Sequence, residues 1–191
     1  MKKLGFFLST LLLLAATGIA LAAQAGRYYI PPQYFDAGIQ LVKKDKKSEA
    51  AVFQNATAAF LHDPNTNTLT GLKIAIDTNS IEAARTDTAM NFRSLLETMT
   101  YPELTFVETA PTKFEGDKAK VKGRLSIKGH DQDIILDAVK ESGTDGTTYD
   151  STPLTIKLTG SVPYSESGIL GEVDADETAL KFVFKLRAIK Q

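Results

Sequence analysis

Residues 118–128 alternate between apolar and polar side chains, and all but one of the polar positions hold lysine or arginine. Successive side chains of a β-strand point to opposite faces of the sheet, so this pattern predicts a strand with one buried face and one basic, solvated face. Gly129 and two polar residues interrupt the pattern, which then resumes at Ile134. Two such runs joined by a short polar link predict a β-hairpin.

Short runs of the same kind recur along most of the chain and are separated by turn-forming residues. We expect about eight strands, an arrangement typical of an antiparallel barrel or sandwich. The expected strands cover residues 35–42, 51–61, 69–76, 104–109, 119–128, 132–140, 154–162 and 180–188, after a short aromatic segment at 27–30 that two prolines end.

One segment in the middle has a different period and predicts a single long helix. Asn79 can cap this helix and Glu82 can close a capping box three residues later. Apolar residues, Phe92 among them, then recur at helical spacing until Pro102 ends the segment. The sequence therefore predicts an all-β fold with one helix.

Composition excludes several classes of protein. The chain has 191 residues and no cysteine, which excludes disulfides, thiolate catalysis and cysteine-based zinc sites. A net charge of -1 gives no reason to expect nucleic acid as a partner.

The N-terminus has the pattern of a secretory signal peptide. A basic start is followed by an apolar stretch and by small residues that fit a cleavage site after Ala25, with Ala22 as the alternative. We expect residues 1–25 to be removed and residues 26–191 to form one periplasmic or secreted domain. A retained membrane anchor is the other interpretation, but the apolar stretch is barely long enough to span a bilayer.

Candidate catalytic and metal-binding residues are few. His62 beside Asp63, and His130 near Asp133, are interpreted as surface turn residues, because a metal site needs three or four converging ligands. The acidic residues between Glu172 and Glu177 lack the spacing of a calcium loop. No nucleophile elbow or phosphate-binding loop is present. We therefore predict no enzyme, no metal and no cofactor.

Three segments resemble the YceI-type family of exported, lipocalin-like polyisoprenoid-binding proteins. The first is VKGRLSIKG at residues 121–129 with its return strand at 134–137, and the second is YPELTF at 101–106. The third is the C-terminal strand at 180–190. The chain resembles a divergent member, since Ala89 stands where the family has a helix histidine and Arg85 is displaced by one residue beside the matching Asp87.

This resemblance implies an antiparallel, eight-stranded lipocalin-like β-barrel with a helix over its mouth. Its apolar tunnel would hold an isoprenoid quinone, a polyprenyl phosphate or another long-chain amphiphile. The chain would then be a non-enzymatic carrier or sequestering protein and not an integral membrane protein. The loop at residues 164–177 could support a homodimer.

The alternating strands place apolar residues on faces that can line such a tunnel. The alternative is that they pack against each other as a filled core, in which case an outer face would serve as a structural or protein-interaction surface. Arg85 and Asp87 could contact a lipid head group, or could form an exposed ion pair. The predicted tunnel residues are Val121, Leu125, Ile127, Leu154, Ile156, Leu158, Phe182, Phe184, Leu186 and Phe92.

Overall fold

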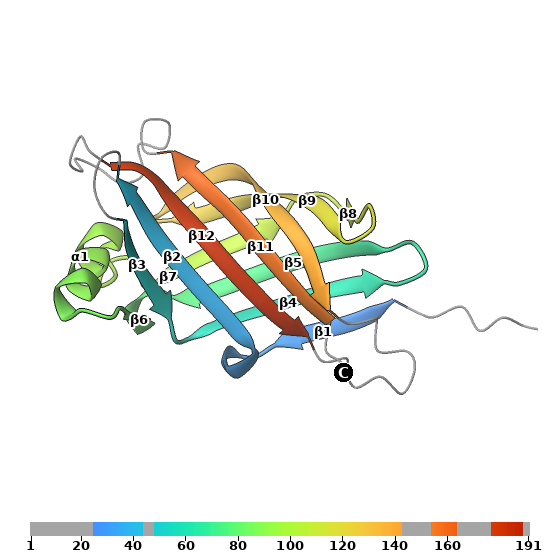
Figure 1. The fold of residues 1–191 in the computed structure, drawn as a ribbon, viewed down its shortest axis with the longest axis horizontal. Coiled ribbons are helices and arrows are strands. Elements are labelled where there is room, and N and C mark those ends of the chain that lie inside the picture. Colours follow the sequence, from blue (N-terminus) through green and yellow to red (C-terminus); the bar gives the residue numbers. More distant parts are fainter. Residues whose placement is uncertain (1–24, 44–47, 143–153, 164–176, 189–191) are drawn as a thin grey trace, which may run out of the picture.

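The computed structural model describes residues 25–43, 48–142, 154–163 and 177–188, and within them a single antiparallel sheet curls around one apolar interior (Figure 1). The sheet has twelve strands, eleven of them in the order β1-β4-β5-β7-β9-β10-β11-β12-β2-β3-β6, while β8 pairs with β5 off this path. The strands are β1 (Gly26–Ile30), β2 (Phe35–Lys43), β3 (Glu49–Phe53), β4 (Ala56–Asp63), β5 (Thr68–Asp77), β6 (Ile81–Glu82), β7 (Glu103–Glu108), β8 (Thr112–Lys113), β9 (Lys118–Ile127), β10 (His130–Ser142), β11 (Leu154–Pro163) and β12 (Glu177–Ala188).

The prediction of an antiparallel, all-β fold with one helix is confirmed, but twelve strands form where about eight were expected. Part of the difference comes from two strands of two residues each, β6 and β8, which are too short to show a period. The rest comes from β1, which forms at the short aromatic segment, and from the expected strand at residues 51–61, which is divided at Gln54 and Asn55. β3 pairs with β2 and β4 pairs with β5, so the chain changes neighbours at this corner.

The predicted hairpin forms as β9 and β10, with ten residue pairs in register from Ile127↔His130 to Lys118↔Val139. Opposite charges face each other on its outer side: Lys120 Nζ lies 2.7 Å from Asp137 Oδ1, and Arg124 Nε lies 3.2 Å from Asp133 Oδ1. Cross-strand pairs of this kind favour one register, although each contributes little because it is exposed.

Two of the family-like segments contact each other. A Cβ built on Gly123 of β9 would lie 2.2 Å from Cζ of Phe106 on β7, so the aromatic ring occupies the space above the glycine. A Cβ on Gly129 would lie 2.9 Å from Cε1 of Tyr101. Glycine is therefore needed at both positions for close packing, and at Gly129 also for a backbone φ of +72°.

The helix is shorter than predicted. α1 spans Thr86–Leu96, and the segment before it forms a 3-10 turn, η2 (Thr78–Ser80), followed by β6. The predicted capping box is wrong, because Asp77 caps the amide of Asn79 in η2 and Glu82 instead accepts from Gln54 Nε2. The helix ends in a left-handed residue, Glu97, five positions before Pro102.

α1 lies at one end of the curled sheet, beside β3 and β6 (Figure 1). Its apolar stripe consists of Ala89, Phe92 and Leu96, which are buried, so the helix packs against the sheet through this face. A second 3-10 turn, η1 (Pro32–Tyr34), joins β1 to the first residue of β2. The predicted signal peptide up to Gln24 and the acidic residues Glu172, Asp174 and Asp176 lie outside the described residues.

Candidate functional site

The interior of the curled sheet is apolar and continuous. All ten predicted tunnel residues belong to the one buried core cluster, and none is more than 2% exposed. Nine of them lie on strands, where the period of two explains their inward orientation, and Phe92 lies on the apolar stripe of α1. That these side chains contact a bound lipid stays a prediction. The residues are Val121, Leu125, Ile127, Leu154, Ile156, Leu158, Phe182, Phe184, Leu186 and Phe92.

The register brings several of these residues directly opposite one another. Ile156 faces Leu186 and Leu158 faces Phe184 across β11 and β12. Phe184 also lies near two other rings, with centroid distances of 6.0 Å to Phe182 and 5.9 Å to Phe35. Phe35 was not predicted at this site, although its place at the start of an alternating strand could have indicated it.

Arg85 and Asp87 lie at the start of α1, outside the apolar interior. They form an ion pair whose side chains are 76% and 58% exposed. The hydrogen bond from Arg85 lowers the pKa of Asp87, and the same bond raises the pKa of Arg85. This is the exposed ion pair that the sequence left as one alternative, and a role in head-group binding stays a prediction.

The hairpin tip is tied to the end of the helix by a second ion pair. Lys128 Nζ lies 2.8 Å from Glu97 Oε1, and the lysine side chain is only 9% exposed, compared with 50% for the glutamate. Lys128 adopts a positive φ of 50° in the tight turn between β9 and β10, and Glu97 has a φ of 49° at the helix C-cap. The pair therefore links two turns at the same end of the sheet.

A few polar groups face the interior. Gln132 of β10 pairs with Leu125 and shares its face with Ile134 and Leu136, which are buried. Its Oε1 is shielded from solvent and has no hydrogen-bond partner among the described residues. Gln132 was not predicted at this site, although the alternation that resumes at Ile134 extends backwards to it and could have indicated it.

Two other inward-facing polar side chains belong to the opposite end of the sheet from α1. His62 is 3% exposed, so the prediction of a surface turn residue is wrong. It continues the buried face of Ala58 and Phe60 on β4, because the strand extends further than its composition suggested. His130 is exposed, in agreement with the prediction.

Glu108 is the other inward-facing polar side chain, and it is buried with both carboxylate oxygens engaged. Oε2 accepts from the amide of Leu72 at 3.0 Å and Oε1 accepts from Thr112 Oγ1 at 2.7 Å. These bonds join β5, β7 and β8, so the carboxylate has a structural role.

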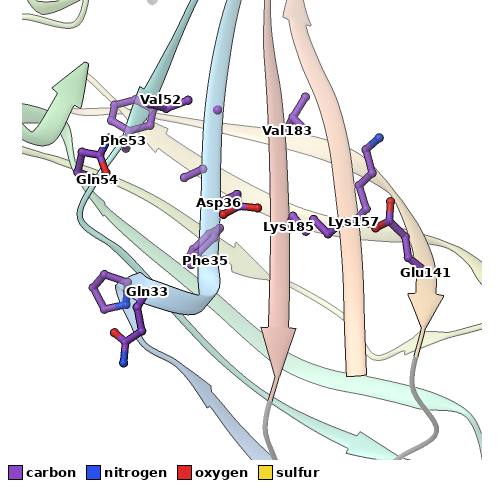
Figure 2. Close-up of a pocket in the computed structure, with 13 residues that line it drawn as sticks. Gln33, Phe35, Asp36, Val52, Phe53, Gln54, Glu141, Lys157, Val183 and Lys185 are labelled. Carbon is purple, nitrogen blue, oxygen red and sulfur yellow. Dashed lines mark ion pairs between the residues drawn. The ribbon is translucent and has the colours of Figure 1, made fainter. Parts of the chain in front are cut away.

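The outer face carries a separate groove of about 610 Å³ across β2, β3, β10, β11 and β12 (Figure 2). Gly38 contributes no side chain to it, and the flanking Val52 and Val183 are 47% and 40% exposed. On its polar side Lys185 Nζ lies 2.6 Å from Glu141 Oε2. The hydrogen bond from Lys185 lowers the pKa of Glu141.

The described residues contain no cluster of three or more histidine, aspartate or glutamate side chains that could hold a metal ion. In the same part of the chain, no helix has both the length and the apolar composition required to cross a membrane. The charged side chains described above form ion pairs, or hydrogen bonds with the backbone and with polar side chains.

These features place the protein in a class of all-β proteins that are built on one curled antiparallel sheet, with a continuous apolar interior and a helix at one end. A YceI-like domain matches residues 40–186, and the chain belongs to the YceI-like family. The resemblance of the sequence motifs to this family is therefore confirmed.

Several solved structures have the same fold. BcnA of Burkholderia cenocepacia is 19% identical, with a TM-score of 0.65 over 82% of this chain and 98% of that chain. The Campylobacter jejuni YceI protein is 20% identical, with a TM-score of 0.62 over 74% and 85%. A polyisoprenoid-binding domain from Saccharophagus degradans, described as implicated in plant cell wall breakdown, is 14% identical, with a TM-score of 0.50 over 87% and 100%. These similarities show the fold. No curated protein sequence matched the chain.

Proposed function

We propose that the chain is a non-enzymatic carrier or sequestering protein for a long-chain isoprenoid or similar amphiphile in the bacterial envelope. The observation that carries this proposal is the continuous apolar interior of a YceI-like sheet, to which every predicted tunnel residue contributes. The description of the Saccharophagus degradans domain as polyisoprenoid-binding supports the same ligand class. The signal-peptide pattern of residues 1–25 supports export to the periplasm.

The strand pairing supports a closed barrel for this function. If β3 and β4 are counted as one bent strand, that strand pairs with β5 through its second half and with β2 through its first half. With β7, β9, β10, β11 and β12 between them, the circuit has eight strands, and β1, β6 and β8 are additions to it. An eight-stranded barrel is wide enough to be filled by side chains or to hold one elongated ligand. In this reading α1 lies over one end of the barrel.

Affinity for such a ligand requires little polar chemistry. Burying apolar surface stabilises a complex by about 25 cal/mol per Å². A polyprenyl chain is long and wholly apolar, so transfer from water into the interior provides the main favourable term.

Lipid uptake by the delipidated domain tests the proposal. We expect residues 26–191 to take up solanesol or ubiquinone from vesicles, measured by extraction of the isolated protein. Ile156→Phe should fold and reduce uptake, because the added ring occupies ligand space. Val183→Phe, on the outer face, is the matched control and should leave uptake unchanged. Failure of the wild-type domain to take up either lipid would contradict the carrier function.

A second candidate function rests on the outer groove. Val52 and Val183 are exposed there beside an ion-paired polar side, which is a composition suited to a protein partner. If the interior is a filled core, this face is where we would expect the structural or interaction role to lie.

A further inference from the structure

Gln132 is half-buried, and its amide oxygen is shielded from solvent beside the apolar interior of the sheet. Gln132 belongs to the inward-facing row of β10, together with Ile134 and Leu136, which are 9% and 0% exposed. It lies opposite Leu125 of β9. No described residue donates a hydrogen bond to its Oε1, which is shielded from solvent. A buried acceptor without a donor destabilises a folded protein, and native proteins retain such groups where a ligand or water completes them.

Within the ranges that the structure describes, the same part of the interior offers no free positive charge. Lys128 is the single lysine or arginine that is buried among the described residues, and its Nζ is already paired with Glu97. A phosphate placed beside Gln132 would be a buried anion without a cation, which is strongly unfavourable. An uncharged head group with a hydroxyl avoids this cost and supplies the donor that Oε1 lacks.

We propose that Gln132 Oε1 accepts a hydrogen bond from the head group of the bound lipid, and that this lipid is an uncharged long-chain amphiphile with a hydroxyl group, of the polyprenol class. This inference rests on the proposed carrier function and adds the polarity of the head group and its position. Gln132 lies two residues beyond the β9–β10 hairpin tip, so the head group sits at the end of the sheet that α1 occupies, while the hydrocarbon chain extends along the apolar interior.

Three isoprenoid lipids of different polarity test the inference: solanesol, solanesyl phosphate and the hydrocarbon squalene, each offered to the delipidated domain in vesicles. We expect the wild type to bind solanesol at least about tenfold more tightly than solanesyl phosphate. Gln132→Leu should weaken solanesol binding about tenfold and leave squalene binding unchanged. Gln40→Leu makes the same change on the outer face of β2 and should affect neither lipid.

Stability of the free variant provides a readout that is independent of the ligand. Because Gln132→Leu removes an unpartnered acceptor, the Tm of the lipid-free protein should not fall. Gln132→Met, which keeps the length of the side chain, is the second variant and should show the same loss for solanesol.

Several results would overturn the inference. Equal loss of solanesol and squalene binding would assign Gln132 a packing role, and unchanged solanesol binding would mean that water satisfies Oε1. Tighter binding of solanesyl phosphate would contradict the uncharged head group while leaving the carrier function intact. If the wild type bound none of the three lipids, the carrier function would fail together with the inference.

Discussion

The ring of Phe106 on β7 lies directly over Gly123 on β9, where a Cβ would come within 2.2 Å of Phe106 Cζ and 2.7 Å of the carbonyl oxygen of Val107. The two residues belong to different family-like segments, and Phe106 is fully buried. This contact explains why a glycine interrupts the apolar face of an otherwise regular strand: a large ring from the neighbouring strand fills the space that its side chain would take.

Replacement of Gly123 by alanine should therefore destabilise the fold by about 1–3 kcal/mol, the usual cost of forcing extra atoms into a packed interior. Unfolding in urea measures the change. Phe106→Leu should recover part of the loss in the double variant, whereas the contact with the Val107 backbone should remain. Gly38→Ala is the control, since its Cβ would meet only atoms at 3.6 Å or beyond. An equal loss for both glycines would contradict the explanation.

The pair formed by Lys128 and Glu97 should contribute more than the exposed pairs of the sheet. Glu97→Gln would leave a lysine that is 9% exposed without its carboxylate, and we expect a loss of about 1–2 kcal/mol in urea unfolding. Asp133→Asn breaks the exposed pair with Arg124 and should cost less than about 1 kcal/mol. Similar losses for the two variants would show that the burial of Lys128 has no energetic consequence.

Glu108 should tolerate an amide but not an apolar side chain. In Glu108→Gln one amide oxygen can still accept from the Leu72 amide, and the Thr112 hydroxyl can reverse its role and accept from the new NH₂ group. We expect a loss of about 1 kcal/mol for glutamine and about 2–4 kcal/mol for leucine, which leaves two donors unpaired. Equal tolerance of leucine, measured by the same denaturation, would rule out the proposed structural role of the carboxylate.

Glu141 should titrate below its ordinary pKa of 4.5 because Lys185 donates a hydrogen bond to its carboxylate, with smaller effects from Lys157 and Arg187. A depressed pKa in the folded state contributes stability above pH 4.5 that is lost as the pH falls through the folded value. Lys185→Met should raise the pKa towards 4.5, as followed by NMR titration of the carboxyl carbon. Lys181→Met, on the same face of β12, should leave it unchanged. A pKa that does not respond to Lys185→Met would contradict the assigned cause.

Regular alternation made most of the fold predictable from the sequence. The β9–β10 hairpin and β11 extend over nearly the residues expected, because each has a continuous apolar face that only a strand can bury. The helix start was misplaced because Asn79 and Glu82 fit a capping box locally, whereas in the structure Asp77 caps the amide of Asn79 and Glu82 accepts a tertiary hydrogen bond from Gln54. The corner at Gln54 and Asn55 was missed, although these two successive polar residues interrupt the alternation between Phe53 and Ala56.

The candidate site was predictable only in part. Burial of residues such as Leu158 and Phe184 followed from their strand period. The roles of Gln132 and Glu108 did not, since an inward-facing polar side chain can be interpreted only when its partners in space are known. Burial of His62 likewise depends on how far β4 extends, which its turn-like neighbours concealed.

Native mass spectrometry with organic extraction, applied to the protein purified from the envelope of its own host, tests the carrier function most directly. We expect one long-chain isoprenoid or related amphiphile to be retained per domain and to appear in the extract. A protein that carries no such lipid, and that takes up neither added quinone nor added polyprenol, would contradict the account and assign the apolar interior to a filled core.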